Sequence, residues 1–228
     1  MTVDHAQHPA VAALAAEVLP LLRDRDRVVV GLAGPPGTGK STVAAALVEH
    51  LRAAGTDSVL VPMDGFHLDQ RELVRLGRAG RKGAPDTFDV GGYVALLRRL
   101  RAADEPLVLA PRFDRDLEQP VGSALAVHRP TRVVVTEGNY LLLDRSDLRH
   151  PLSDDMTMAT WPQVRKLLDR CWFVDVDPEV RVERLVARHV AFGRSPEAAR
   201  EWVLRNDEAN AALVARTRPR ADGVVAWG

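Results

Sequence analysis

The sequence predicts an α/β fold: a parallel sheet at the core with helices on both faces. Two observations lead to this fold class. Strand-like segments alternate with segments of helical periodicity, and several strand-like segments, such as 132–136 and 171–176, are continuous apolar runs. Such runs are typical of parallel strands, because helices cover both faces of a parallel sheet. The length of 228 residues, with no internal repeat or low-complexity linker, favours a single domain over 1–228.

The expected strands are short apolar or alternating runs that end at turn residues. Val28, Val29 and Val30 make the first run β-branched throughout, which suits a buried strand. Ligands bind beyond the carboxyl ends of strands in sheets of this kind. In chain order the expected strands lie at 28–30, 58–63, 132–136, 171–176 and 223–227, with a pair of short strands around an exposed loop within 107–128.

The expected helices combine helical spacing of apolar residues with start and stop signals. Pro20 kinks or ends the first helix, within an N-terminal helical region over 1–26, and Gly55 and Gly193 end two later ones. Asp177 caps a helix that has proline at its first position. In chain order the expected helices lie at 9–22, 42–54, 69–78, 93–102, 161–170 and 178–191, with one more after Ser195-Pro196.

The composition narrows the class of partner. Acidic and basic residues balance at 31 each, without the basic patch or stripe of a nucleic-acid binder, so we expect no nucleic-acid partner. No run approaches the roughly 18 apolar residues of a membrane span, and we see no signal peptide, so we expect no membrane partner. The single cysteine, Cys171, lies in an apolar run and is expected to be a packed thiol, which fits a cytoplasmic location. The oligomeric state is left open, with a homodimer among the options.

Residues 28–42, VVVGLAGPPGTGKST, contain the phosphate-binding motif G-x-x-x-x-G-K-[ST] between an apolar strand and a helix. Its glycines let backbone N–H groups point inward, and the helix N-terminus adds positive potential there. We expect Lys40 to reach the outer phosphates and Ser41 to join the shell of a Mg²⁺ ion. The motif therefore predicts a P-loop NTPase fold that binds a nucleoside triphosphate, taken as ATP, with Mg²⁺. The residues expected to bind the nucleotide are Gly34, Pro35, Pro36, Gly37, Thr38, Gly39, Lys40, Ser41 and Thr42.

Two carboxylates are expected at strand ends on the same rim as the phosphate loop: Asp64 and Glu137. Phosphoryl transfer needs a metal held against the β- and γ-phosphates, and a group that orients or deprotonates the attacking oxygen. We assign Asp64 as the base toward a substrate hydroxyl and Glu137 as the metal-side carboxylate. A structural role for either residue, as a cap or as the partner of an arginine, stays open.

Arg181, Arg184 and Arg188 recur at i, i+3 and i+7, which places them on one helix face. Together with Arg194 they predict a short arginine-bearing lid at about 184–196 that clamps the transferring phosphoryl group and excludes water. The glutamates of the same helix keep open the alternative of an ordinary salt-bridged, solvated face.

In chain order, several further segments resemble the uridine kinase and pantothenate kinase group of P-loop small-molecule kinases, including a bacterial subset described as nucleoside/nucleotide kinase or fructokinase-like. MDGFHLD (63–69) is similar to the segment that supplies the base in that group, and RKGAPDTFDV (81–90) to its substrate loop. APRFDRDLE (110–118) resembles a segment that lines the acceptor pocket, TEGNYLLL (136–143) the one with the Mg²⁺-side glutamate, and VDVDPEVRVERLVARH with Gly193-Arg194 the lid.

The resemblance implies roles for individual residues. Asp86 matches an aspartate that bonds substrate hydroxyls in nucleoside kinases, and Phe113 and Asp114 match residues of the acceptor pocket. His67 stands near the place where uridine-type kinases usually carry a tyrosine, and it is a further candidate for acceptor contact, with a packed histidine as the alternative. Lys82, in the basic loop, is a candidate for substrate contact, with a solvated side chain as the alternative.

The resemblance also assigns Arg184 and Arg188 to catalysis and Arg194 to the nucleotide. The polar stretch 206–210 is expected to border the pocket. The sequence thus predicts an ATP- and Mg²⁺-dependent kinase that phosphorylates a hydroxyl of a small polyhydroxylated metabolite, such as a nucleoside or a sugar. Two alternatives stay open: a pantothenate-like acceptor, and an ATPase or nucleotide switch with a protein partner.

Overall fold

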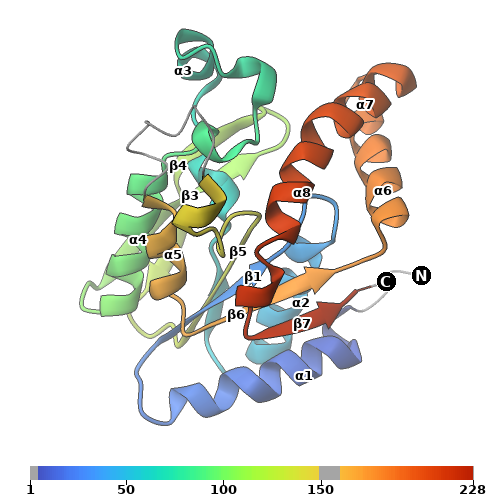
Figure 1. The fold of residues 1–228 in the computed structure, drawn as a ribbon. Coiled ribbons are helices and arrows are strands. Elements are labelled where there is room, and N and C mark those ends of the chain that lie inside the picture. The colour runs from blue at the N-terminus through green and yellow to red at the C-terminus, as the bar shows by residue number, and fades with distance from the viewer. Residues whose placement is uncertain (1–4, 149–159, 228) are drawn as a thin grey trace.

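The computed structural model describes residues 5–148 and 160–227. Within these residues the central sheet has five strands in the order β2-β5-β1-β6-β7, and every neighbouring pair is parallel (Figure 1). The predicted parallel sheet is therefore confirmed. Its strands are β1 (Val28–Ala33), β2 (Ser58–Leu60), β5 (Val133–Gly138), β6 (Arg170–Asp175) and β7 (Gly223–Ala226).

The side chains of β1 alternate between two hydrophobic cores, one on each face of the sheet. Val28, Val30 and Leu32 pack into the core that includes residues of α1 and α2, and Val29 and Ala33 into the core that includes residues of α4, α5 and α8. Burial of each of these valine and leucine side chains stabilises the fold by about 1.5–3 kcal/mol. The predicted helices on both faces are confirmed. Their bounds are Pro9–Val18 (α1), Lys40–Ala53 (α2), Val90–Ala102 (α4), Pro162–Lys166 (α5) and Glu208–Ala215 (α8).

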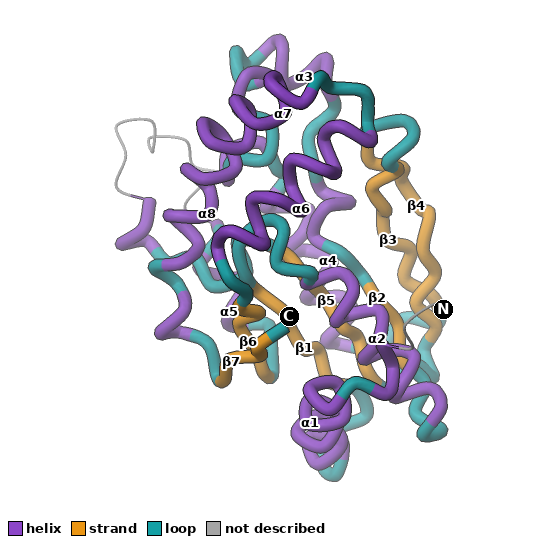
Figure 2. Tube along the Cα trace, turned by 90° about the vertical axis from the view of Figure 1, so that its right-hand side faces the viewer, coloured by secondary structure: helices purple, strands orange, loops and turns teal. Residues whose placement is uncertain are grey.

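Other elements surround the carboxyl end of the sheet. An antiparallel hairpin of β3 (Leu107–Asp114) and β4 (Gln119–His128) forms a sheet of its own (Figure 2). The remaining α-helices are α3 (Gln70–Arg75), α6 (Pro178–Ala191) and α7 (Pro196–Trp202), and a π-helix at Val203–Asp207 leads from α7 into α8. Short 3₁₀ helices lie at His5–Gln7, Leu19–Leu22, Met63–Phe66, Ala79–Arg81, Pro85–Thr87, Arg145–Leu148 and Arg218–Arg220.

Several predicted boundaries differ from the structure, and proline accounts for two of them. The second strand ends at Leu60 because Pro62 has no N–H to donate to β5, and a 3₁₀ turn follows it. The first helix ends at Val18, since Pro20 cannot donate to the carbonyl four residues earlier. The fourth helix begins before the predicted start, because the Asp89 side chain accepts from the N–H of Gly92 at 2.8 Å and caps it. The first residues of the predicted N-terminal helical region, 1–4, lie outside the described residues.

Cys171 is buried on β6, as predicted, and burial raises the pKa of its thiol to about 12. In the part of the chain that the structure describes, no helix combines the length and the apolar character needed to cross a membrane.

Candidate active site

The phosphate loop joins β1 to α2, as its motif predicts. Gly37 has a positive φ of 85°, and a Cβ atom there would lie 2.8 Å from the carbonyl oxygen of Arg181 on α6. Any other residue would therefore be strained and would also clash with α6. The loop enters α2 at Lys40, so the positive end of the helix lies at the wall of a cavity.

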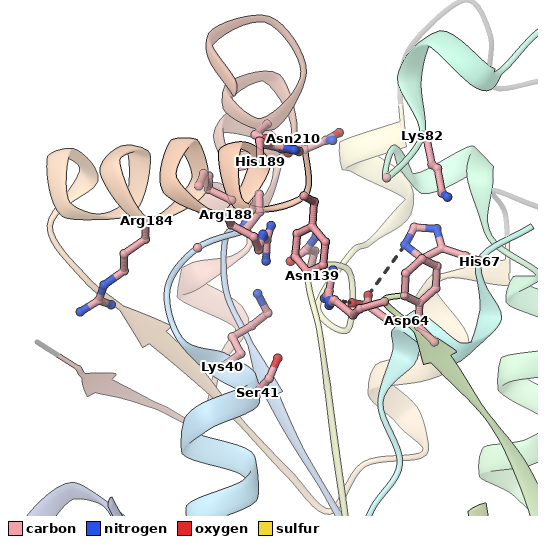
Figure 3. Close-up of a pocket in the computed structure, with 18 of the residues that line it drawn as sticks. Lys40, Ser41, Asp64, His67, Lys82, Asn139, Arg184, Arg188, His189 and Asn210 are labelled. Atoms are coloured by element: carbon pink, nitrogen blue, oxygen red, sulfur yellow. Dashed lines mark hydrogen bonds and ion pairs between the residues drawn. The ribbon is translucent and has the colours of Figure 1, made fainter. Parts of the chain in front are cut away.

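Lys40 is buried inside this loop. Its Nζ donates to the carbonyl oxygen of Pro35 at 3.0 Å, and Figure 3 shows the side chain extending toward the open site. Burial lowers the pKa of Lys40. The charges of Glu137 and Asp64 oppose this shift, whereas those of Arg188 and Arg181 add to it. A phosphate group beside Lys40 would add negative charge where several cations converge.

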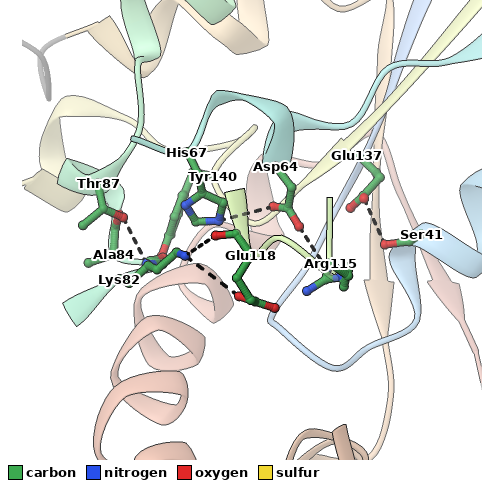
Figure 4. Close-up of polar contacts among 11 residues, drawn as sticks. Ser41, Asp64, His67, Lys82, Ala84, Thr87, Arg115, Glu118, Glu137 and Tyr140 are labelled. Atoms are coloured by element: carbon green, nitrogen blue, oxygen red, sulfur yellow. Dashed lines mark hydrogen bonds and ion pairs between the residues drawn. The ribbon is translucent and has the colours of Figure 1, made fainter. Parts of the chain in front are cut away.

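Glu137 lies on β5 opposite Leu32 of β1, so the strand register brings it next to the phosphate loop. The Ser41 hydroxyl donates to Glu137 Oε1 at 2.9 Å (Figure 4). Glu137 is only 4% exposed, and burial, together with the charge of Asp64, raises the pKa of its carboxyl. Lys40 and the hydrogen bond from Ser41 act in the opposite direction. A cation at this position would stabilise the ionised carboxylate.

The pair of Ser41 and Glu137 fits the metal role that the sequence predicts for it. Hydroxyl and carboxylate oxygens are the hard donors that Mg²⁺ takes. Across 5–148 and 160–227, no group of three or more His, Cys, Asp or Glu side chains is placed to hold a metal by itself. Two oxygen donors suit Mg²⁺, because this ion usually keeps several waters and takes substrate phosphate oxygens into its shell.

Asp64 lies on the 3₁₀ turn after β2, with 30% of its side chain exposed. Its Oδ2 accepts from Arg115 Nη2 at 3.4 Å, and its Oδ1 lies 4.0 Å from His67 Nε2 (Figure 4). The turn packs directly on β3, because a Cβ at Gly65 would lie 2.5 Å from the carbonyl oxygen of Pro111. Asp64 therefore stands between the phosphate loop and the hairpin, where an acceptor hydroxyl would have to lie.

His67 belongs to an aromatic group beside Asp64. Its ring stacks on Phe88 at 4.0 Å between centroids and meets the edge of Phe113 at 5.2 Å. Burial lowers the pKa of His67 to about 4, and the cations of Lys82 and Arg115 contribute in the same direction, against the charge of Asp64. The imidazole is therefore neutral at physiological pH and offers hydrogen-bonding groups without a charge.

A cavity of about 630 Å³ connects the phosphate loop with Asp64 and the aromatic group. It is large enough for the reacting ends of a nucleotide and a small acceptor. Most residues that the sequence predicts for the site line it: Pro36, Gly37, Gly39, Lys40, Ser41, Thr42, Asp64, His67, Lys82, Phe113, Glu137, Arg184, Arg188 and Arg194.

Five of the residues predicted to bind the nucleotide or the acceptor do not line this cavity. Gly34, Pro35 and Thr38 belong to the inner side of the phosphate loop, where the carbonyl of Pro35 accepts from Lys40 and from the Thr38 hydroxyl. Asp86 forms ion pairs with Arg81 and Arg78 and does not line the cavity. Asp114 accepts from the N–H groups of two following residues at 3.0 Å each and fixes the hairpin turn. Both carboxylates thus make contacts within their own loops, and their contact with an acceptor stays a prediction.

The predicted lid arginines have three different surroundings. Arg181 is buried, pairs with Glu208 at 2.6 Å and lies 3.5 Å from the carbonyl of Pro36, so it anchors α6 to the phosphate loop. Arg188 extends toward Lys40, whereas Arg184 extends in another direction from the same helix (Figure 3). Arg194 lies over the ring of Trp202 at 4.3 Å.

Sequence reasoning missed several residues that line the cavity. Asn139 directly follows Glu137-Gly138, and its position after a predicted strand end was the available signal. His189 also lines the cavity and lies 3.0 Å from Asp207. Asp207 and Asn210 line the cavity too, and both belong to the stretch 206–210 that the sequence analysis places at the border of the pocket. Others come from the hairpin turn, the substrate loop and the lid: Arg115, Glu118, Gly83, Phe88, Leu185, Phe192 and Trp202.

The arrangement of sheet, phosphate loop and lid agrees with a comparison to known families. A family model described as "Phosphoribulokinase / Uridine kinase family" matches residues 29–227. The chain belongs to this family. The resemblance to uridine kinase-like P-loop kinases is therefore confirmed, and the chain is a P-loop kinase.

Relatives with kinase names are similar in sequence to this chain over most of its length. "Putative uridine kinase C227.14" of Schizosaccharomyces pombe is 32% identical over 213 residues, which cover 90% of this chain and 85% of that protein. "ATP-dependent kinase-like protein notR'" of Aspergillus versicolor is 36% identical over 165 residues, which cover 68% of this chain and 88% of that one. Both names describe kinases, and the family supports ATP as the phosphoryl donor.

Solved structures give the same result for the fold. A "putative fructose transport system kinase" from Silicibacter sp. TM1040 superposes with a TM-score of 0.82 at 36% identity, covering 96% of this chain and 98% of that one. YFH7 from Saccharomyces cerevisiae has a TM-score of 0.75 at 21% identity and covers 95% of this chain and 98% of that one, which supports the fold alone.

Proposed function

We propose that the protein transfers the γ-phosphoryl group of ATP, with Mg²⁺, to a hydroxyl of a small polyhydroxylated metabolite such as a sugar or a nucleoside. The observation that carries this proposal is the shared cavity. Lys40 and Ser41 lie at its phosphate end, Asp64 lies beside them, and room for a second small molecule continues past His67 and Phe113. An ATPase without an acceptor would not need this second compartment.

The chain's own residues account for binding and charge. The phosphate loop and the N-terminus of α2 would hold the β- and γ-phosphates, and Lys40 and Arg188 would offset the negative charge that spreads over the transferring group. Ser41 and Glu137 would hold Mg²⁺, which would neutralise charge on the phosphate oxygens when bound. Phe192 and the helix α6 border the same space and would exclude water from it.

Asp64 would act on the acceptor. As the acceptor oxygen bonds to the γ-phosphorus, the bond from that phosphorus to the β–γ bridging oxygen breaks, and the acceptor proton passes to the Asp64 carboxylate. At this step the Asp64 carboxylate would either break its contact with Arg115 or accept from Arg115 and the hydroxyl at once. The 3.4 Å contact between the two side chains is long and half exposed on the arginine side, so its loss costs little.

An acceptor screen that measures ADP release tests the proposal. We expect ADP release to depend on one class of hydroxyl compound among nucleosides, hexoses, pentoses and pantothenate. Asp64→Asn should lower kcat for that acceptor by about 10²–10⁴-fold, because the base is lost. The dissociation constant of MgATP should change little, since Asp64 lies beyond the phosphates.

The control is Asp104→Asn, which removes an exposed carboxylate just after α4. Equal loss of turnover and of MgATP binding in Asp64→Asn would contradict the base assignment. ATP hydrolysis that no small hydroxyl compound stimulates would instead favour the ATPase or nucleotide-switch alternative. Stimulation by pantothenate alone would favour the vitamin-kinase alternative.

A further inference from the structure

The substrate loop presents a cation, not a carboxylate, to the acceptor side of the cavity. Asp86 lies 2.6 Å from Arg81 Nη2 and 3.4 Å from Arg78 Nε, and its side chain is only 12% exposed. This carboxylate is therefore engaged within the loop and is not among the residues that line the cavity. Lys82, from the same loop, lines the cavity.

A second cation comes from the hairpin turn and meets Lys82 over one aromatic ring. Lys82 Nζ lies 5.3 Å and the Arg115 guanidinium carbon 5.5 Å from the centroid of Phe113. His67 approaches the edge of the same ring, and Figure 4 shows Lys82 and Arg115 on the two sides of Asp64 and His67. Two segments that are far apart in the sequence thus converge on the acceptor position with positive charge.

The carboxylates near these cations leave their charge largely available. Glu118 Oε2 is 3.9 Å from Lys82 Nζ, and this glutamate is 54% exposed, so their attraction is weak in water. The 2.8 Å hydrogen bond of Lys82 goes instead to the backbone carbonyl of Glu118, which carries no net charge. Arg115 Nη2 lies 3.4 Å from Asp64 Oδ2, and Asp64 is the group that would turn to the acceptor hydroxyl.

Two neighbouring groups respond to these cations. Burial is the largest cause of the lowered pKa of His67, and Lys82 and Arg115 lower it further, against the charge of Asp64. Burial and then Arg115 lower the pKa of Arg188, against the charges of Asp207, Asp64 and Glu118. An anion at this position would relieve repulsion among these groups and would gain charge-assisted hydrogen bonds. A neutral acceptor would leave the repulsion in place.

We propose that the acceptor carries an anionic group, a carboxylate or a phosphate, in addition to its reacting hydroxyl, and that Lys82 and Arg115 bind this group beside Phe113. This inference rests on the proposed function, because it takes the molecule bound by Lys82 and Arg115 to be the phosphoryl acceptor. Within the class of polyhydroxylated metabolites, it selects hydroxy acids and sugar phosphates over neutral sugars and nucleosides.

Binding to the MgADP-loaded enzyme tests the inference without requiring turnover, because ADP occupies the phosphate loop. The probes form matched sets: D-ribose, D-ribonate and D-ribose 5-phosphate, and D-fructose and D-fructose 6-phosphate. Isothermal titration calorimetry should show at least about ten-fold tighter binding of an anionic member than of its neutral partner. The member that binds, carboxylate or phosphate, identifies which anion the site takes.

Single variants assign the effect to the two cations. Lys82→Gln and Arg115→Gln should each raise the dissociation constant of the anionic probe by about ten-fold or more. The dissociation constant of the neutral probe should change by less than about two-fold. The matched controls are Lys166→Gln and Arg112→Gln, both exposed and outside the cavity lining, which should change neither. Melting temperatures of all variants check that the fold is intact.

Two outcomes would overturn the inference: no anionic probe binds more tightly than its neutral partner, or the variants weaken anionic and neutral probes equally. ADP release, measured on the same probes, distinguishes this failure from failure of the proposed function. Turnover of neutral probes alone would leave the kinase proposal standing and remove the anionic acceptor. Selective anion binding without turnover of any probe would support the anion site at Lys82 and Arg115 and contradict the proposed kinase activity toward these compounds.

Discussion

The two ends of the cavity are built in different ways. At the phosphate end, Lys40 and Ser41 follow the loop after β1, and Glu137 lies on β5. Lys40 and Glu137 are buried, Lys40 donates to the carbonyl of Pro35, and Ser41 donates to Glu137. At the acceptor end, Lys82 and Arg115 come from two separate loops and are 21% and 46% exposed. The sheet fixes the first set through strand register, whereas turn geometry and surface side chains set the second. Under the proposed function, chemistry common to many kinases would rest on the part that the sheet fixes, and choice of acceptor on the loops.

The largest effect is expected from Lys40→Ala. Removal of a buried cation from the transferring phosphoryl group should lower kcat by about 10³-fold for every acceptor tested. Steady-state ADP release with saturating ATP measures this, with Lys166→Ala as the exposed control. A fall in kcat that depended strongly on the acceptor would contradict the separation of roles between the phosphate end and the acceptor end.

Next in size is a pH effect at the acceptor end. His67 has a pKa lowered to about 4 by burial, so the unfolded chain binds its proton near pH 6.5 and the folded chain does not. Its contribution to stability is therefore lost as pH falls from about 6.5 to 4, by about 3 kcal/mol at pH 4.

Denaturant unfolding at a series of pH values measures this slope. His67→Gln should flatten it, and the exposed His128→Gln should leave it as in the wild type. An unchanged slope in His67→Gln would mean that the imidazole is protonated inside the fold.

Glu137→Gln should affect the phosphate end alone. The amide keeps an acceptor for Ser41 but has no charge for a divalent cation, so the Mg²⁺ concentration for half-maximal rate should rise and kcat should fall by about 10²-fold. A Mg²⁺ titration of ADP release measures both, with Glu49→Gln on the exposed side of α2 as control. A normal Mg²⁺ requirement would remove Glu137 from the metal site.

The smallest effect is expected where the substrate loop is anchored. The Tyr140 hydroxyl donates to the carbonyl of Gly83, and Trp161 Nε1 donates to that of Pro85 at 3.1 Å. Tyr140→Phe should therefore cost about 1 kcal/mol of folding stability and raise KM for the acceptor, with KM for ATP unchanged. Equal changes in both KM values would show that the loop serves both ends.

The difference between the ends also explains what could be predicted from the sequence. The valine runs and the phosphate motif predict the sheet, Lys40 and Ser41, because strand burial and loop curvature follow from local residue types. Asp86 and Asp114 have the expected residue types, but the direction of each carboxylate depends on nearby arginines and N–H groups. Arg115 reaches the cavity only because the hairpin folds back over the turn at Gly65, a long-range contact without a local pattern.

The same limit applies to the lid. Helical spacing predicts that Arg181 and Arg188 share a face, and both do point inward. Their surroundings differ because Glu208 of α8 forms an ion pair with Arg181. A π-helix cannot be read from residue types, so the position of Asp207 beside His189 could not be derived from spacing.

Two polar contacts between α6 and the segment that leads into α8 have a mechanical consequence: an ion pair of Arg181 with Glu208 and a contact of His189 with Asp207. Arg181 holds Glu208 at one point along α6, and His189 holds Asp207 two turns further on. A helix fastened at two points cannot pivot by itself. Any outward swing of α6 would either break both contacts or carry α8 with it, so an opening of the proposed lid would be coupled to the packing of α8.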